Sequence, residues 1–131
     1  MNLKNKKILI TGATGGIGND LVKKFSSLGA SIIATGTNQA KLDKLKSEFL
    51  DIKTKQFKLN EHDKIENFID SCHNDLGGLD ILVNNAGITL DNISLRLTID
   101  DWKKVMDVNL TSTFLMCKYS IKKMLKNKYG K

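Results

Sequence analysis

The 131-residue chain contains no proline, two cysteines and a single arginine. Cys72 and Cys117 stand far apart and outside any metal-ligand spacing, which predicts two free thiols rather than a disulfide or a metal site. No apolar run approaches the ~20 residues that a membrane span needs. The N-terminal run at Ile8–Ile10 is too short for the core of a signal peptide. These absences predict a cytoplasmic protein with no membrane segment, and the two histidines, His62 and His73, are expected on its surface.

The formal net charge is +7, which raises nucleic acid as a partner. Twenty of the 21 basic residues are lysines spread along the chain, however, and aromatic residues make up only 6%. Sites that bind nucleic acid favour arginine forks and aromatic platforms. The charge therefore favours a solvated surface over a nucleic-acid site, with a weak attraction to acidic ligands or partners.

Short apolar runs alternate with helix-length amphipathic segments. Strands are predicted at 6–11, 31–35, 54–59 and 80–84, and helices at 16–28, 39–49, 62–76, 100–108 and 109–126, with a loop at 88–98. Four helices are expected to bury an apolar face: Ile17, Leu21, Val22, Phe25 and Leu28; Leu42, Leu45 and Phe49; Ile65, Phe68, Ile69 and Cys72; and Leu110, Phe114, Cys117, Ile121 and Leu125. This order predicts one α/β domain with a parallel sheet, right-handed crossovers and helices on both faces.

A glycine-rich turn, Thr11-Gly12-Ala13-Thr14-Gly15-Gly16-Ile17-Gly18, joins the first predicted strand to the first predicted helix. Gly12 allows a sharp turn, Gly16 allows backbone to approach a pyrophosphate, and Gly18 lets the helix pack close to the sheet. The helix N-terminus offers free N–H groups and the positive end of its dipole. The spacing is GxxxGxG, and its place between strand and helix favours a dinucleotide site over an ordinary turn.

Two further segments follow later strands. After the second strand, Thr35-Gly36-Thr37-Asn38 has no acidic residue for a ribose 2′-hydroxyl, which favours NADP modestly over NAD. After the fourth strand, Asn84-Asn85-Ala86-Gly87 borders the crevice where open α/β sheets bind ligands. An Asx-rich turn explains that segment equally well.

In order and spacing, these motifs resemble the short-chain dehydrogenase/reductase family. The resemblance rests on TGATGGIG, on DILVNNAG at 80–87 and on Asp107-Val108-Asn109-Leu110, and it covers essentially the whole chain. The stretch 84–110 is similar to one branch, the 3-oxoacyl-[acyl-carrier-protein] reductases of fatty-acid synthesis. The resemblance implies a Rossmann-type doubly wound parallel sheet with strand order 3-2-1-4, truncated after the fourth strand and the following long helix. The single domain at 1–131 would then be incomplete on its C-terminal side.

The resemblance also implies roles for matching residues. The pyrophosphate would be held by Gly12, Thr14, Gly15, Gly16, Ile17 and Gly18. Thr37 would meet the 2′-phosphate of NADP, Asn60 the adenine, and Asn85, Ala86 and Gly87 the ribose, while Asn109 matches a catalytic asparagine that anchors a water. Many relatives carry an arginine before the second glycine of the turn to help hold the 2′-phosphate, and this chain has Gly15 there.

The family's reaction needs a serine followed by Tyr-x-x-x-Lys, which relatives carry after a fifth strand. The one local match, Tyr119-x-x-x-Lys123, lies ten residues after Asn109 in the same predicted helix, so we interpret it as a chance match. Two hypotheses follow: NADPH-dependent reduction of 3-oxoacyl-[acyl-carrier-protein], completed by residues absent here, or a non-catalytic dinucleotide-binding fragment. A reductase with another substrate also remains open.

Three expectations concern partners. Lys128 matches a basic position near the active-site mouth of such reductases, where an acidic acyl-carrier protein could dock, although a helix-end lysine favoured by the macrodipole is the stronger interpretation. Full-length relatives are expected to form homo-oligomers. With its fourth strand and last helix uncovered, the isolated chain is expected to be marginally stable or oligomeric.

Overall fold

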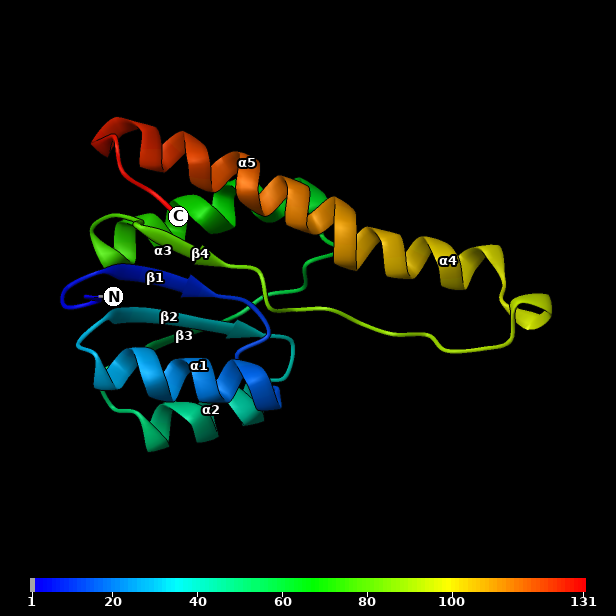
Figure 1. Cartoon of the computed structure of the whole chain (residues 1–131), viewed down its shortest axis with the longest axis horizontal. Coiled ribbons are helices and arrows are strands. Elements are labelled where there is room, and N and C mark those ends of the chain that lie inside the picture. Colours follow the sequence, from blue (N-terminus) through cyan, green and yellow to red (C-terminus); the bar gives the residue numbers. More distant parts are fainter. Residues whose placement is uncertain (1) are drawn as a thin grey trace.

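The computed structural model describes residues 2–131, and its centre is a parallel sheet of four strands (Figure 1). The strands are β1 (Lys7–Ile10), β2 (Ser31–Gly36), β3 (Lys53–Gln56) and β4 (Ile81–Val83). Their order is β3-β2-β1-β4, and Ile8 pairs with Ile32 on one side and with Ile81 on the other. The predicted doubly wound order is confirmed; β2 begins at the predicted residue, and the other strand ends differ from the predictions by one to three residues.

Helices cover both faces of the sheet. They are α1 (Gly16–Ser27), α2 (Gln39–Glu48), α3 (Ile65–Leu76), α4 (Ile99–Met106) and α5 (Ser112–Met124). In Figure 1, α1 and α2 lie on one face and α3 and α5 on the other, while α4 and the segment before it extend away from the sheet. Short 3₁₀ turns occur at His62–Lys64, Ser94–Arg96 and Leu125–Asn127, so the predicted loop at 88–98 holds one turn of helix.

No break separates the last two helices. A π-helical turn, Asp107–Thr111, connects α4 directly to α5, and we refer to it as the π-turn. The predicted boundary between residues 108 and 109 falls inside it. At the other end of α4 a capping box forms, in which the Thr98 hydroxyl accepts the Asp101 N–H and the Asp101 carboxylate bonds back to Thr98.

The core has two halves because side chains alternate across each strand. One cluster includes Ile8, Ile10, Ile32 and Ala34 with residues of α1 and α2. The other includes Leu9 and Ile33 with residues of α3 and α5. The central strands are therefore buried on both faces, as a parallel sheet requires.

Two of the predicted buried faces need correction. In α1, Val22 is buried, but Ile17 is 74% exposed because it lies at the mouth of a cleft rather than over the sheet. In α5, the side toward the core is formed by Ser112, Met116, Ser120 and Met124. The residues expected there, Leu110, Phe114, Ile121 and Leu125, are all more than half exposed, and Cys117 is half-buried. The predicted faces of α2 and α3 are buried or packed on the core as expected.

Among residues 2–131, no helix is both long enough and apolar enough to cross a membrane.

Candidate functional site

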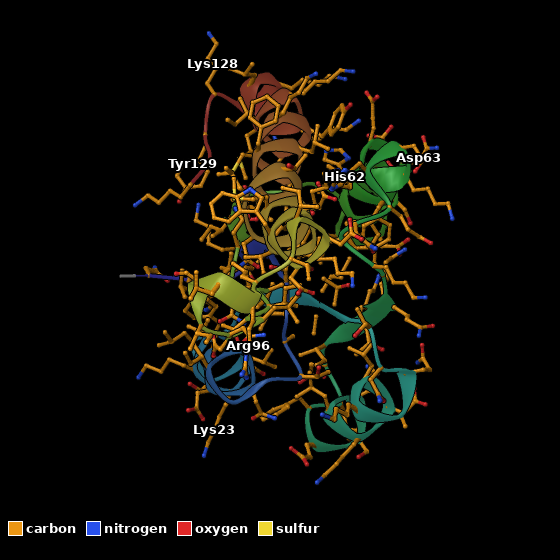
Figure 2. All side chains as sticks on the ribbon, turned by 90° about the vertical axis from the view of Figure 1, so that its right-hand side faces the viewer. Lys23, His62, Asp63, Arg96, Lys128 and Tyr129 are labelled. Atoms are coloured by element: carbon orange, nitrogen blue, oxygen red, sulfur yellow. The ribbon has the colours of Figure 1, made fainter. Side chains whose placement is uncertain are left out.

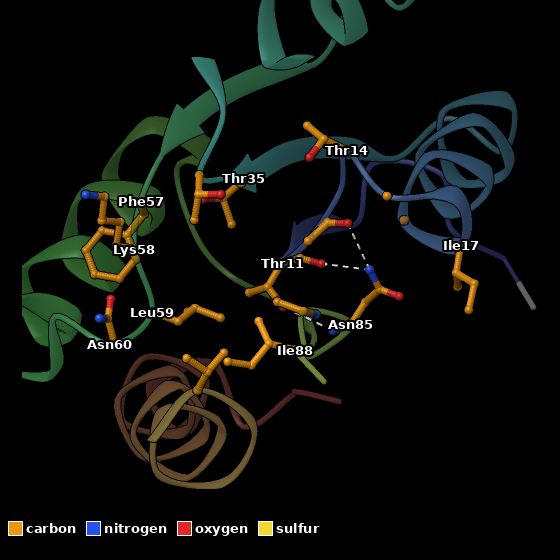
Figure 3. A pocket seen from close by; sticks show the side chains of 18 of the residues that line it. Thr11, Thr14, Ile17, Thr35, Phe57, Lys58, Leu59, Asn60, Asn85 and Ile88 are labelled. Atoms are coloured by element: carbon orange, nitrogen blue, oxygen red, sulfur yellow. Dashed lines mark hydrogen bonds between the residues drawn. The ribbon is translucent and has the colours of Figure 1, made fainter. Parts of the chain in front are cut away.

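A cleft of about 560 Å³ opens at the carboxyl ends of the strands. Its walls come from the turn after β1, the end of β2, the segment after β3, the segment after β4 and the π-turn (Figure 3). This is the crevice where an open α/β sheet binds its ligand, at the point where the strand order reverses between β1 and β4. The lining residues include every residue predicted to bind cofactor: Gly12, Thr14, Gly15, Gly16, Ile17, Gly18, Thr37, Asn60, Asn85, Ala86 and Gly87.

The glycine-rich turn needs glycine at two positions for packing. Gly12 has φ +62°, and a Cβ there would lie 2.8 Å from the Ala86 Cα. A Cβ on Gly18 would collide with the Gly12 carbonyl oxygen and lie 2.7 Å from the Ala13 Cα. Both glycines therefore let the turn, the start of α1 and the segment after β4 pack together.

Gly16 differs because a Cβ there would meet nothing within 4 Å. It opens onto the cleft at the first turn of α1, where Gly15 is the N-cap residue and supplies no side-chain hydrogen bond. The first acceptor used by the helix is the Gly15 carbonyl, which takes the N–H of Asn19. The N-terminal N–H groups of α1 and the positive end of its dipole therefore face the cleft, an arrangement that suits an anion.

Hydrogen bonds of Thr11 and Asn85 connect the turn after β1 to the segment after β4. The Thr11 hydroxyl donates to the Val83 carbonyl at 3.2 Å and accepts the N–H groups of Asn85 and Ala86 at 3.1 and 3.0 Å. The Asn85 side-chain amide donates to the Thr11 and Gly12 carbonyls, both at 3.0 Å (Figure 3). The asparagine-rich segment is thus a structural element of the cleft floor as well as part of its lining.

The wall formed by β2 and β3 carries polar groups. Thr35 is 2% exposed, and its hydroxyl has no hydrogen-bond partner among the described residues. Gln56 donates from Nε2 to the Thr37 carbonyl at 2.8 Å, which ties the end of β3 to the segment after β2. Lys58 is the one ionisable side chain lining the cleft within residues 2–131. The wall therefore offers a cation, an unsatisfied buried hydroxyl and no acid.

Asn109, the predicted catalytic residue, lies in the π-turn beside the cleft. Its Oδ1 accepts the N–H of Ile88 at 2.8 Å, and its Nδ2 donates to the Ile88 carbonyl at 2.8 Å. Ile88 and Val108 line the cleft on this side. The side chain of Asn109 thus clamps the backbone just after Gly87, while its own carbonyl accepts the Thr113 hydroxyl at 2.9 Å.

Several lining residues were not predicted. Thr11, Thr35, Lys58, Leu59, Ile88 and Val108 all contribute to the cleft. Thr11 and Thr35 stand at or next to the carboxyl ends of predicted strands, and that position was the signal that could have identified them. Lys58 stands next to the carboxyl end of the predicted strand at 54–59 and carried the same signal. Val108 carried none, because it lines the cleft only through the way in which the chain after β4 folds back.

Other residues singled out in the sequence lie elsewhere. Lys123 pairs with Asp70 of α3 at 2.6 Å and Tyr119 packs on the core, so neither lines the cleft, in agreement with a chance match. Lys128 follows the end of α5 and is next to Tyr129 (Figure 2). The amine of Lys6, which directly precedes β1, lies 3.9 Å from the centre of the Tyr129 ring. Lys128 therefore lies at the opposite end of the sheet, and its expected place near the mouth of this chain's cleft is wrong.

The histidine and cysteine predictions have mixed outcomes. Both cysteines are free, as expected; Cys72 is buried, and burial raises the pKa of its thiol to about 12. His62 is not a plain surface residue. It is half-buried, and its Nε2 lies 3.1 Å from the Asp107 carbonyl oxygen of the π-turn.

Comparison with known proteins follows the same motifs. A family model described as short chain dehydrogenase matches residues 6–131. Similar curated proteins include the 3-oxoacyl-[acyl-carrier-protein] reductases of Haemophilus influenzae, 39% identical over 98% of this chain and 54% of the relative, and of Aquifex aeolicus, 37% identical over 100% of this chain and 55% of the relative. The chain thus spans about half the length of the curated relatives it matches.

Solved structures give the same result. The crystal structure of gox2181 superposes with a TM-score of 0.93 at 27% identity, covering 98% of this chain and 52% of that one. A short-chain dehydrogenase/reductase from Brucella melitensis, described as glucose/ribitol dehydrogenase, superposes with a TM-score of 0.87 at 26% identity, covering 94% and 53%. Fold, motif order and family model agree: the chain belongs to the short-chain dehydrogenase family.

Proposed function

We propose that this chain provides the cofactor-binding half of an NADPH-dependent reductase that converts 3-oxoacyl-[acyl-carrier-protein] to the 3-hydroxyacyl form in fatty-acid synthesis. The observation that supports it most directly is the cleft at the carboxyl ends of the strands, which brings together every predicted cofactor residue. The choice of substrate is supported by the names of the two curated relatives, both of which are 3-oxoacyl-[acyl-carrier-protein] reductases.

The residues present fit a dinucleotide. Gly16 leaves open space at the N-terminus of α1, so the pyrophosphate would be held there by Gly12, Thr14, Gly15, Gly16, Ile17 and Gly18. Asn60 would hold the adenine and Asn85 to Gly87 the ribose. Thr35 lies in the wall of the cleft, where its buried hydroxyl has no partner among the described residues. When bound, NADPH supplies the hydride.

We propose NADP rather than NAD as the cofactor. No acidic side chain lines the cleft among the described residues, and Thr37, which lines it after β2, would receive the 2′-phosphate. The family's usual arginine is replaced by Gly15, so Lys58 is the side chain that could balance the phosphate charge.

Asn109 would contribute to the reaction by holding the Ile88 backbone with its side chain and anchoring a water of the proton relay. The serine and the Tyr-x-x-x-Lys pair that would protonate the substrate oxygen have no counterpart at the cleft in residues 2–131. We therefore propose that this chain alone binds cofactor without turnover. The alternatives are a non-catalytic dinucleotide-binding module and a reductase for another substrate.

Partners are proposed on the same grounds. An acyl-carrier protein would be the acidic partner of this basic chain, given the names of the relatives. Because Lys128 lies away from the cleft, we expect Lys128→Glu to leave carrier-protein affinity unchanged, and a loss of affinity would show that the carrier protein docks at the other end of the sheet. We also propose a cytoplasmic location and homo-oligomers, with neither nucleic acid nor a membrane as partner.

A substitution at Gly16 can test cofactor binding without changing the stability of the fold. We expect Gly16→Ala to weaken NADPH binding at least tenfold, because the added methyl group enters the space for the phosphates. The melting temperature should stay unchanged or rise slightly, because alanine favours a helix. Titration calorimetry on wild type and variant measures this, with Asn19→Ala in the same helix as the control. No NADPH binding by the wild type, or equal affinity in both proteins, would refute the proposed site.

Turnover has its own test. NADPH oxidation with an acetoacetyl thioester should be undetectable with this chain alone. Turnover that Tyr119→Phe abolishes would show instead that Tyr119 is catalytic.

A further inference from the structure

A buried serine joins two walls of the cleft. Ser112, the first residue of α5, has no exposed surface, and its hydroxyl lies 2.7 Å from the Leu59 carbonyl oxygen and 2.6 Å from that of Asp107. Leu59 belongs to the wall that follows β3, and Asp107 begins the π-turn. One hydroxyl therefore connects the β3 side of the cleft to the side that carries Asn109.

His62 makes a second connection to the same point. Its Nε2 lies 3.1 Å from the Asp107 carbonyl oxygen and 3.3 Å from the Ser112 hydroxyl oxygen. A carbonyl oxygen only accepts, so the shorter contact is a hydrogen bond when Nε2 carries a proton. The serine has a single proton for two carbonyl oxygens, and the imidazole N–H supplies the donor that the hydroxyl lacks.

The Asp107 carbonyl is also the group that distinguishes the π-turn from an α-helix. It accepts the N–H of Ser112, five residues on, where an α-helix would use the residue four on. Isolated π-helical turns are rare and occur often at functional sites. The contacts of His62 and Ser112 stabilise this carbonyl in the π register.

The π register in turn places Asn109. Both polar atoms of its side chain bind the backbone of Ile88, at 2.8 Å each, and Ile88 lines the cleft next to Gly87. A path of hydrogen bonds thus runs from His62 through Asp107 and the π-turn to Asn109 and Ile88. His62 itself is not among the residues that line the cleft.

We infer that His62 is a positioning residue for Asn109: by donating to the Asp107 carbonyl it fixes the π-turn, and the π-turn holds the Asn109 clamp on Ile88. The part played by the clamp in cofactor binding rests on the proposed function. The positioning itself does not, because it is a property of the ligand-free chain.

The experiment compares two replacements of His62 in the 131-residue chain. His62→Leu removes the donor, whereas His62→Gln retains a side-chain N–H. We expect amide exchange at Ile88, measured by NMR without ligand and divided by that of Leu9 in β1, to rise about fivefold in His62→Leu, the effect of losing one hydrogen bond. It should change less than twofold in His62→Gln and in the control His73→Leu. NADPH affinity should fall several-fold in His62→Leu only.

Each outcome has a distinct meaning. Equal exchange at Ile88 in the Leu and Gln variants, or a parallel rise at Ile88 and Leu9, would overturn the positioning role, because the donor would then be irrelevant or the effect global. If exchange follows the expected pattern but no protein binds NADPH, the positioning role stands and the proposed function fails. If NADPH binds equally to all variants while exchange differs, the clamp is real and does not serve cofactor binding.

Discussion

The hydroxyl of Thr11 sits where three backbone groups meet. It donates to Val83 and accepts from Asn85 and Ala86, so the strand end of β1 and the segment after β4 share one side-chain atom. Gly12 follows directly and needs φ +62° and a missing Cβ to approach Ala86. Thr11 therefore connects β1 to the segment after β4 through its hydroxyl oxygen. Gly12 allows the same two segments to pack closely because it has no Cβ.

Lys58 is the residue on which cofactor choice should depend. We expect Lys58→Met to weaken binding of NADPH about tenfold and leave NADH binding unchanged, because only NADPH carries the extra phosphate that a cation stabilises. Fluorescence titration with both cofactors measures the ratio.

Lys44, an exposed lysine of α2, gives the matched control in Lys44→Met. If Lys58→Met weakens both cofactors equally, or neither, Lys58 does not determine the preference.

Among the elements, α3 and α5 are fastened by charge as well as by packing. Lys123 pairs with Asp70 at 2.6 Å and Lys122 pairs with Glu66 at 2.8 Å. The hydrogen bond from Lys123 lowers the pKa of the Asp70 carboxyl, and the hydrogen bond to Glu66 raises the pKa of Lys122. The pairs are partly exposed, so each adds little to stability.

The Asp70 pair should give a small acid-sensitive contribution. A depressed carboxyl pKa stabilises the fold at pH values well above 3.8, and this is lost as the pH falls through the lower pKa of the folded state. We therefore expect Asp70→Asn to lower the urea midpoint slightly at pH 7 and to lower it less at pH 2.5, which is below 3.8. Urea unfolding at both values measures it, with Asp20→Asn as the control. A midpoint difference as large at pH 2.5 as at pH 7 would contradict the charge mechanism.

The order of the elements could be predicted from the sequence because each depends on a local signal. Apolar runs such as Ile8–Ile10 and amphipathic spacing in α3 arise within one turn or strand. The glycine-rich turn was predictable for the same reason, because Gly12 has φ +62° and a Cβ on Gly18 would meet the backbone of Gly12 and Ala13.

Features that depend on distant partners could not be predicted. The π-turn is stabilised by His62, 45 residues before Asp107, and no spacing in the sequence signals that contact. The helical spacing of apolar residues correctly indicated a helix at α5, but such spacing does not show which face of the helix packs against a neighbouring element. The small side chains of Ser112 and Ser120 face the core beside Met116, while Phe114 stays exposed. Ile17 shows the same limit, because apolar residues line clefts as well as cores.

The whole molecule presents an exposed apolar surface along α4 and α5. Trp102, Leu110, Phe114, Ile121 and Leu125 are each more than half exposed, and Leu95 in the preceding segment is 96% exposed. Apolar patches of this kind favour association.

We expect the isolated chain to self-associate at micromolar concentrations, and Phe114→Lys with Leu125→Lys to shift it toward monomer. Sedimentation velocity over a range of concentrations measures this. Because Phe114 and Leu125 are exposed, the two lysines should not disturb the core. The double variant Glu48→Gln with Asp51→Asn raises the net charge by the same amount at exposed positions outside α4 and α5, and it provides the control for changed surface charge. A wild-type monomer with a single cooperative melt would contradict the expectation.

Both ends of the described chain emerge on the side away from the cleft. The amine of Lys6 contacts the ring of Tyr129, and Lys131 exchanges backbone hydrogen bonds with Asp80 and Leu82 at the start of β4. In Figure 1 the start of β1 and the red segment that ends the chain lie at the opposite ends of the strands from the glycine-rich turn. The molecule can therefore be tethered to a sensor surface or a fluorescent label through either end, and the cleft lined by Gly16 and Asn60 will still face the solution.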